Sequence, residues 1–343
     1  MDDLLDGWFP YATFQPYQQM MLENVAETAR QGGIALIDAP TGSGKSSVVS
    51  ALLAESEERP IFVAVRTVSQ LNTFIRELQL IRQKKKKLRF AYLVGKSTMC
   101  PLGGEGDVYR RCEGVKALST SLMTDRARKG ALVPAKDILI RQQIRKASRD
   151  RPLICPYFIN SRVFVNQEDA GLRMVASPSL RTRADRVSAE VVLPERLNDY
   201  CGEICPYETM LHAARGADVV LFNFHHILNG QIREQLYAAL GVEASEVLLL
   251  IDEAHNCGDA VQDIESVKLE ENLLDQAAIE LSQMRRSVPA AEALQQILPS
   301  MRQFMDILKG SHEAEDWFDP AIFTRMLIKG SLYQNLEETI EDL

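Results

Sequence analysis

The sequence lacks the features that would assign it to a membrane or to the secretory pathway. No apolar run approaches the ~18 to 20 residues that a membrane-spanning helix needs. The first residues, Met1-Asp2-Asp3-Leu4-Leu5-Asp6, are acidic and do not resemble a signal peptide. We therefore expect a cytoplasmic protein, or a nuclear one in a eukaryote, with no membrane partner. Cysteines are mostly reduced in these compartments, so metal or cluster ligation is expected more than disulfides.

The sequence also lacks internal repeats and any Cys-x₂-Cys pair, which is the usual element of a structural zinc site. Its only close cysteine pair is Cys201-x₃-Cys205, and Cys155-Pro156-Tyr157 has the same tripeptide sequence as Cys205-Pro206-Tyr207. Proline after a ligating cysteine fixes the turn and removes a competing N–H. Scattered thiolates favour a cuboidal iron–sulfur cluster over zinc. Zinc and unliganded, packed cysteines remain alternatives, and Cys257 is expected to be a packed residue.

The charge is unevenly distributed. The net charge is −8, yet residues 82–151 hold 19 Lys and Arg against 6 Asp and Glu, whereas residues 252–343 hold 7 against 19. Local patches create the field that attracts phosphates, so the acidic net charge does not exclude a nucleic-acid partner. For the basic run Lys84-Lys85-Lys86-Lys87 alone, a solvated loop before a strand is the favoured interpretation.

Short apolar runs alternate with helical patterns, which is typical of a parallel, doubly wound α/β sheet. The strand candidates are residues 34–37, 61–65, 90–94, 219–222 and 247–251. Residues 97–206 break this alternation, are irregular in pattern and contain five of the six cysteines. We therefore predict one α/β domain, formed by residues 1–96 and 207–258, with residues 97–206 inserted. Residues 259–343 read as amphipathic helices with breaks near Pro289, Pro299, Gly310 and Pro320.

A phosphate-binding loop follows the first apolar run, at Ala39-Pro40-Thr41-Gly42-Ser43-Gly44-Lys45-Ser46. Gly42 and Gly44 permit backbone conformations that a β-carbon hinders, and the loop N–H groups then face the phosphates. Lys45 is expected to contact the β- and γ-phosphates, and the Ser46 hydroxyl to ligate Mg²⁺. Ala39 stands where the motif usually has Gly. Thr41, Gly42, Ser43, Gly44, Lys45 and Ser46 are thus the expected ATP-binding residues.

An acidic box, Asp252-Glu253-Ala254-His255, directly follows the last apolar run. Asp252 at the end of a strand suits a second Mg²⁺ contact, and Glu253 is then the candidate to polarise the attacking water. The structural alternative is an acidic pair that caps a helix N-terminus. His255 is either a link to other motor motifs or a hydrogen-bonded loop residue.

Together these motifs resemble the XPD family of superfamily 2 iron–sulfur helicases, over about residues 8–258. Phe14-Gln15-Pro16-Tyr17-Gln18 looks like the adenine-side segment, although Gln15 stands where Arg is common. Arg66 to Gln70 looks like a motif that contacts single strands, and Gly95-Lys96-Ser97-Thr98-Met99-Cys100 like the entry to the cluster. Asn223 to Leu228 looks like the segment before the acidic box.

The resemblance implies a RecA-like motor domain, a cluster insertion and the start of a helical arch domain. It implies ATP, Mg²⁺ and a [4Fe-4S] cluster as cofactors, with Gln18 reading adenine. The implied cluster ligands are Cys100, Cys112, Cys155 and Cys205, with Cys201 as the alternate to Cys205. The implied nucleic-acid contacts are Arg66, Thr67, Gln70 and Lys96. The implied activity is 5′-to-3′ movement on single-stranded DNA, with fork junctions as further partners.

The family pattern includes a second RecA-like domain whose arginines complete the ATP site, and no such pattern follows residue 258. We therefore expect this domain to be supplied in cis by a longer chain or in trans by a partner, and the chain alone to be weakly active or inactive as a helicase. Two other hypotheses remain. One is a cluster-bearing or zinc-bearing single-stranded DNA scaffold with little ATP turnover, and the other is a P-loop ATPase with a structural zinc insertion. The pattern leaves the oligomeric state open.

Overall fold

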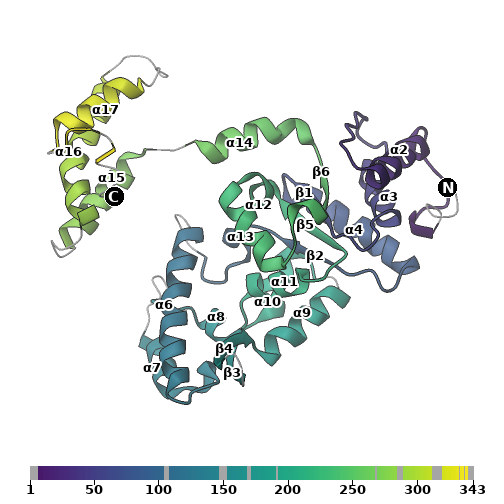
Figure 1. Ribbon diagram of the computed structural model, residues 1–343, viewed down its shortest axis with the longest axis horizontal. Coiled ribbons are helices and arrows are strands. Elements are labelled where there is room, and N and C mark those ends of the chain that lie inside the picture. Colours follow the sequence, from purple (N-terminus) through teal and green to yellow (C-terminus); the bar gives the residue numbers. More distant parts are fainter. Residues whose placement is uncertain are drawn as a thin grey trace. The chain divides into compact units, whose positions relative to one another are not determined.

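The computed structural model describes residues 7–103, 108–146, 153–167, 171–190, 192–266, 269–283, 289–310, 319–331, 333–335 and 337–338. It forms two compact units, Met1–Ile264 and Glu265–Leu343. Figure 1 shows the chain coloured along its sequence, with a mixed α/β fold in the first unit and helices in the second.

A four-stranded parallel sheet forms the centre of the first unit. Its strands are β1 (Ile61–Val65), β2 (Phe90–Leu93), β5 (Val219–Asn223) and β6 (Leu248–Ile251), in the order β2-β5-β1-β6. β1 pairs with β5 on one side and with β6 on the other, and Ile61 lies opposite both Val219 and Leu248. Strands that are apolar on both faces suit a sheet covered by helices, and β1 and β2 are buried throughout. The expected parallel α/β sheet is therefore confirmed.

Helices supply the rest of the motor core. The main elements are α2 (Gln18–Gln31), α3 (Val48–Ala54), α4 (Val68–Lys84), α11 (Pro206–Ala214), α12 (Phe224–Leu228) and α13 (Gly230–Leu240). α4 begins with a capping box in which Thr67 accepts from the Gln70 N–H and the Gln70 side chain accepts from the Thr67 N–H. Its apolar residues recur at helical spacing and are buried, including Leu71, Ile75 and Leu78.

The strand expected at residues 34–37 is absent, and this prediction was wrong. The segment has no regular secondary structure, and the side chains of Ile34 and Leu36 are 90% and 91% exposed. A strand needs a hydrogen-bonded neighbour, and among the described residues β6 pairs only with β1. The apolar run is therefore present, but it does not join the sheet.

In the described part of residues 97–206 most residues lie in helices or strands, so the expectation of an irregular insertion was wrong. They contain α5 (Lys96–Met99), α6 (Val108–Arg128), α7 (Ile138–Lys146), α8 (Pro156–Asn160), α9 (Pro178–Glu190) and α10 (Leu197–Cys201). An antiparallel hairpin, β3 (Arg162–Gln167) and β4 (Gly171–Ala176), lies among them. A separate apolar core joins α6, α7 and α8 through Met123, Ile140 and Ile159. α9 and α10 instead pack into the motor core.

The second unit is helical in its described part, as predicted. Its helices are α15 (Glu271–Gln283), α16 (Pro289–Lys309) and α17 (Pro320–Lys329), and α14 (Cys257–Glu265) ends the first unit. The breaks expected at Pro289, Gly310 and Pro320 coincide with helix ends, whereas α16 continues through Pro299, so that expected break was wrong. No helix in the described ranges is long and apolar enough to cross a bilayer.

Candidate functional site

The phosphate-binding loop adopts the conformation that its glycines allow. Gly42 and Gly44 have φ of +85° and +78°, in the left-handed region, and the Ser43 N–H donates to the Pro40 carbonyl over 3.2 Å. The chain then enters a short 3₁₀ turn, Lys45–Ser47, that leads into α3. Thr41 is exposed, and the Ser43 hydroxyl is buried without a hydrogen-bond partner. The loop therefore contains a polar group that a bound ligand could satisfy.

Lys45 folds over its own loop. Its Nζ donates to the Ala39 carbonyl oxygen over 2.7 Å and to the Pro40 carbonyl oxygen over 3.3 Å. Carbonyl acceptors satisfy the ammonium N–H groups but leave the positive charge in place. An anion at the loop would therefore be attracted to Lys45. Ser46 follows it in the same half-buried turn.

Gln18 joins the adenine-side segment to the loop. Its side chain is buried, its Nε2 donates to Ser47 Oγ over 2.9 Å and to the Gly44 carbonyl over 3.3 Å, and its Oε1 accepts from the Gln15 N–H. A β-carbon on Gly44 would lie 2.2 Å from Gln18 Nε2. Gly44 is therefore required both by its φ and by this close approach. To read adenine, Gln18 would have to exchange some of these bonds.

The acidic box follows the carboxyl end of β6. The Asp252 N–H donates to the Ala64 carbonyl on β1 over 3.0 Å, which fixes the box beside the neighbouring strand. Burial raises the pKa of the Asp252 carboxyl, Glu253 adds to that rise, and the Lys45 charge opposes it. Lys45 and Asp252, 207 positions apart, thus lie within electrostatic reach. Glu253 has φ of +52°, which is uncommon for a residue with a β-carbon, and its Oε2 lies 3.6 Å from Nδ1 of exposed His255.

The carboxyl ends of β1, β5 and β6 are tied together by polar side chains. Asn223 Nδ2 donates to the Arg66 carbonyl over 3.0 Å, and Arg66 Nη1 donates to Asn256 Oδ1 over 2.5 Å. Gln70 Oε1 accepts from the Arg66 and Thr67 N–H groups. The structure therefore brings Arg66, Thr67 and Gln70 together beside the acidic box. Sequence reasoning missed Asn256, although its position just after the box was an available signal.

Three of the candidate thiols line one small cavity of about 30 Å³. They are Cys100, which ends α5, Cys112 on α6, and Cys155, which is the N-cap of α8. Burial raises the pKa of Cys155 to about 11, and the neighbouring thiols Cys100 and Cys112 contribute to this rise. Burial also raises the pKa of Cys205, and Cys155 and Cys112 add to the effect. The four side chains are therefore close enough to influence one another electrostatically.

The two Cys-Pro-Tyr segments have the same local structure. Cys155 and Cys205 are the N-caps of α8 and α11, with proline at the first helical position of each. The Cys155 N–H donates to Ser119 Oγ over 2.9 Å, and the Cys205 N–H donates to Ser161 Oγ over 3.0 Å. Both serines are fully buried. These serines were missed, because nothing in their sequence spacing connects them to the cysteines.

Cys201 lies in a different environment from Cys205. It is fully buried in the motor core, and burial raises its pKa, with a Thr209 hydrogen bond and the Arg183 charge opposing the rise. None of the other thiols contributes to that shift. Among the described residues, no three His, Cys, Asp or Glu side chains converge on the geometry of a single metal ion.

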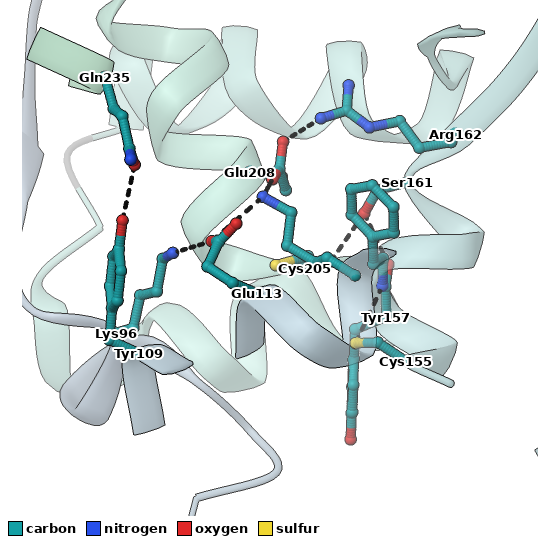
Figure 2. Close-up of polar contacts among 12 residues, drawn as sticks. Lys96, Tyr109, Glu113, Cys155, Tyr157, Ser161, Arg162, Cys205, Glu208 and Gln235 are labelled. Carbon is teal, nitrogen blue, oxygen red and sulfur yellow. Dashed lines mark hydrogen bonds and ion pairs between the residues drawn. The ribbon is translucent and has the colours of Figure 1, made fainter. Parts of the chain in front are cut away.

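A chain of charged groups runs beside the thiols, as Figure 2 shows. Lys96 Nζ lies 2.5 Å from Glu113, Lys116 Nζ lies 2.9 Å from Glu208 and 3.9 Å from Glu113, and Arg162 also contacts Glu208. Burial favours a neutral Glu208, but the Lys116 and Arg162 charges outweigh it, so the pKa of Glu208 is lowered. The network joins Lys96 and α11, on the motor side, to α6 and β3 of the insertion.

Lys96 is enclosed rather than presented to solvent. Its side chain is 7% exposed, and its Nζ lies 4.0 Å from the centre of the Tyr109 ring and 5.0 Å from that of Tyr207. Tyr109 in turn donates to Gln235 on α13 over 2.7 Å (Figure 2). Lys96 would have to leave this aromatic cage to reach a DNA phosphate.

The first unit thus combines a parallel α/β sheet with a glycine-rich loop and an acidic box, which are features of the helicase class that the sequence resembles. The DEAD_2 family model matches residues 63–274, which is more than half of the chain. The chain therefore belongs to the DEAD_2 family, and its resemblance to the XPD helicases is confirmed.

Curated relatives include the ATP-dependent DNA helicase XPD of Sulfolobus acidocaldarius, 26% identical over 290 residues that cover 84% of this chain and 40% of that protein. Another is the helicase subunit XPD/RAD3 of the general transcription and DNA repair factor IIH of Saccharomyces cerevisiae, 23% identical over 95% of this chain and 40% of that protein. The chain thus spans about two fifths of their length. A solved structure named XPD_Helicase matches with a TM-score of 0.48 at 18% identity, over 97% of this chain and 50% of that one.

Proposed function

We propose that this chain is the ATP-binding motor unit of an XPD-type DNA helicase. The observation that carries the proposal is the left-handed backbone of Gly42 and Gly44 in the phosphate loop, and the influence of the Lys45 charge on the Asp252 carboxyl supports a common site for the loop and the acidic box. Glycine-rich loop N–H groups and Lys45 would bind the phosphates, and Ser46 and Asp252 would hold Mg²⁺. Glu253 would orient the attacking water.

The residues that support DNA binding lie at the carboxyl ends of the sheet strands. Arg66, Thr67 and Gln70 lie there beside the acidic box, and Arg66 contacts Asn256 directly. A phosphate of single-stranded DNA that engages Arg66 would therefore also act on the box. We propose 5′-to-3′ translocation on single-stranded DNA and at fork junctions when a second RecA-like domain is present, in cis or in trans. The arginines of that domain would accelerate hydrolysis by on the order of 10³ or more.

The nucleotide part is tested with Lys45→Ala and the control Lys129→Ala, which alters an exposed lysine of the insertion. Binding of a fluorescent ATP analogue with Mg²⁺ is measured by titration. We expect Lys45→Ala to weaken binding at least tenfold, because the loop loses its only side-chain cation, while Lys129→Ala binds as the wild type does. Equal affinity in all three proteins would contradict the assignment of the loop.

We also propose that Cys100, Cys112, Cys155 and Cys205 hold a [4Fe-4S] cluster. Their thiolates would supply four soft ligands, and the cluster would cross-link α5, α6, α8 and α11. The lining of one cavity by three of them, and the effect of Cys155 and Cys112 on the pKa of Cys205, support this set. Ser119 and Ser161 would hold the two Cys-Pro turns in place through the cysteine N–H groups.

Cys205→Ser and Cys201→Ser form a matched pair for this assignment, because each removes one thiol and the two positions are four residues apart. Iron content and visible absorbance are measured on anaerobically purified protein. We expect Cys205→Ser to lose the cluster and Cys201→Ser to keep it at wild-type iron content. The reverse result would make Cys201 the ligand. A colourless wild-type protein that contains one zinc would refute the cluster.

A further inference from the structure

A basic cavity of about 550 Å³ lies apart from both the nucleotide site and the thiols. It is formed where the end of α4 and the loop before β2 meet α9 and α11. Its cationic lining residues are Arg82, Lys86, Lys87, Arg89 and Arg215, and Asp185 is its single carboxylate. The cavity therefore carries a local excess of positive charge on a protein whose net charge is −8.

The cavity lies at the amino edge of the sheet. Lys86 to Arg89 directly precede β2, and Arg215 precedes β5, its parallel neighbour. The Asp218 N–H donates to the Arg89 carbonyl over 2.9 Å, which joins the two entering segments. Asp252 and Arg66, in contrast, follow the carboxyl ends of their strands. Because the strands are parallel, the basic cavity and the nucleotide site lie at opposite edges of the same sheet.

In the described part of the chain, no carboxylate forms an ion pair with the five cations of this cavity. Arg82 donates to the Ser188 and Ala189 carbonyls over 2.5 and 3.0 Å, and Arg215 donates to the Ala239 carbonyl over 2.8 Å. Carbonyl oxygens fix the guanidinium planes without neutralising them. Two arginines are therefore oriented beside a rim of exposed lysines.

The pKa of His212, which also lines the cavity, is consistent with the same excess of positive charge. Burial lowers the pKa of His212, and Arg215, Arg162 and Arg181 lower it further, with only Asp185 opposing them. Three cations thus act on this side chain against one carboxylate. An anion in the cavity would meet a favourable field from several elements at once.

The four consecutive lysines of the sequence divide into two pairs. Lys84 donates to the Phe9 carbonyl over 2.7 Å, and Lys85 Nζ lies 4.9 Å from the centre of the Trp8 ring, so these two hold the N-terminal segment. Lys86 and Lys87 are exposed and line the cavity. A merely solvated loop explains neither this division into two pairs nor the arginines that line the same cavity.

We propose that this cavity is a second DNA contact, which binds backbone phosphates at the edge of the motor sheet opposite the nucleotide site. The inference rests on the proposed DNA function and extends it. Oriented guanidinium groups match the geometry of phosphate oxygens, and the exposed lysines Lys86 and Lys87 add sequence-independent attraction. The contact holds a part of the DNA that Arg66 does not reach, and so increases affinity without reading bases.

The test compares Lys86→Gln/Lys87→Gln with Arg76→Gln, which neutralises an exposed arginine of α4 outside the cavity. Binding of a fluorescent 20-nucleotide single strand is measured by anisotropy at several KCl concentrations. Each lost phosphate contact should reduce the slope of log K against log[salt] by about 0.7. We expect a reduction of about 1.4 for the double variant, with several-fold weaker binding in low salt, and no reduction for Arg76→Gln.

Three results would overturn the proposal: an unchanged slope in the double variant, the same reduction per charge in Arg76→Gln, or the absence of DNA binding by the wild type. Tighter binding of a labelled 12-residue polyglutamate peptide than of DNA, lost in the double variant, would assign the cavity to an acidic protein partner and also overturn it. ATP-analogue affinity is measured in parallel. This affinity should be unchanged in the double variant. Lys45→Ala tests the nucleotide site and the double variant tests the cavity, so the two proposals can fail separately.

Discussion

Lys116 Nζ lies 2.9 Å from Glu208 Oε1, and the Glu208 side chain is only 4% exposed. Lys116 belongs to α6 of the insertion, and Glu208 to α11, which packs against β2 of the motor sheet. Arg162 on β3 contacts the other oxygen of the same carboxylate. One buried carboxylate therefore fastens two insertion elements to the motor core.

Replacing Lys116 by Met should destabilise the first unit by about 3 kcal/mol, because removing one partner leaves a buried charge with less compensation. The Met side chain retains most of the aliphatic stem that packs near the Phe158 ring. The free energy of unfolding is measured by denaturant titration. Lys129→Met, at an exposed position, is the control and should change stability by no more than about 0.5 kcal/mol. Equal effects of the two substitutions would contradict a structural role of the pair.

Gly44→Ala should impair the nucleotide loop more than Gly42→Ala. Both residues have positive φ, which costs a β-carbon about 1 kcal/mol, but only the Gly44 β-carbon would collide with Gln18 Nε2, at 2.2 Å. A β-carbon on Gly42 meets nothing within 4 Å. ATP-analogue affinity is measured for both variants, and Gly42→Ala is the matched control. Equal affinities of the two variants would show that the collision with Gln18 is unimportant.

Glu77 should make the first unit less stable as pH rises from about 4. Burial raises its pKa, the Tyr11 hydroxyl at 2.6 Å from Oε2 opposes the rise only in part, and Oε1 has no hydrogen-bond partner. A carboxyl whose folded pKa is raised contributes stability that is present below its unfolded pKa, about 4.3, and is lost as pH rises through the folded value. Glu77→Gln should lose this component of the pH profile, measured by thermal unfolding at several pH values. Glu234→Gln, at an exposed position, should keep the wild-type profile. A wild-type profile in Glu77→Gln would refute the prediction.

Asn256 should couple DNA binding to nucleotide binding. Its Oδ1 accepts from Arg66 over 2.5 Å, so a phosphate that captures Arg66 releases Asn256 beside the acidic box. We expect single-stranded DNA to change ATP-analogue affinity about fivefold in the wild type and not in Asn256→Ala, which corresponds to a coupling of about 1 kcal/mol. Asn256→Asp keeps the acceptor oxygen and should restore the coupling. Wild-type coupling in Asn256→Ala would exclude this route.

The motor sheet could be predicted because its strands are short apolar runs that are buried, and periodicity reports burial directly. β1 and β2 satisfy this rule completely, whereas β6 is only partly buried. The run at residues 34–37 shows the limit of the rule, because an apolar segment becomes a strand only when a neighbouring strand edge pairs with it. The insertion was misjudged for another reason. α6 is a 21-residue helix with weak amphipathicity that is tied by charged side chains as well as by its apolar face.

The arrangement of the thiols could not be predicted from the sequence. Cys201 and Cys205 are four positions apart, and only the fold places one in the motor core and the other beside Cys155. The Cys-Pro-Tyr repeat did favour Cys205, because proline at the first helical position makes each preceding cysteine an N-cap. Ser119 and Ser161 could not be found in this way, since their bonds connect residues 36 and 44 positions apart.

The strand order has a consequence for synthesis of the chain. Each of the three strand pairs, β1 with β5, β1 with β6 and β2 with β5, joins a strand made before the insertion to one made after it. A nascent chain that has left the ribosome as far as Leu93 therefore has no partner for either strand. The insertion leaves the ribosome next. Its own apolar core around Met123 and Ile140 can form while β1 and β2 still have no strand to pair with. Vectorial folding would thus form this separate core before the sheet closes, whereas α9 and α10, which pack into the motor core, would be completed only together with the sheet.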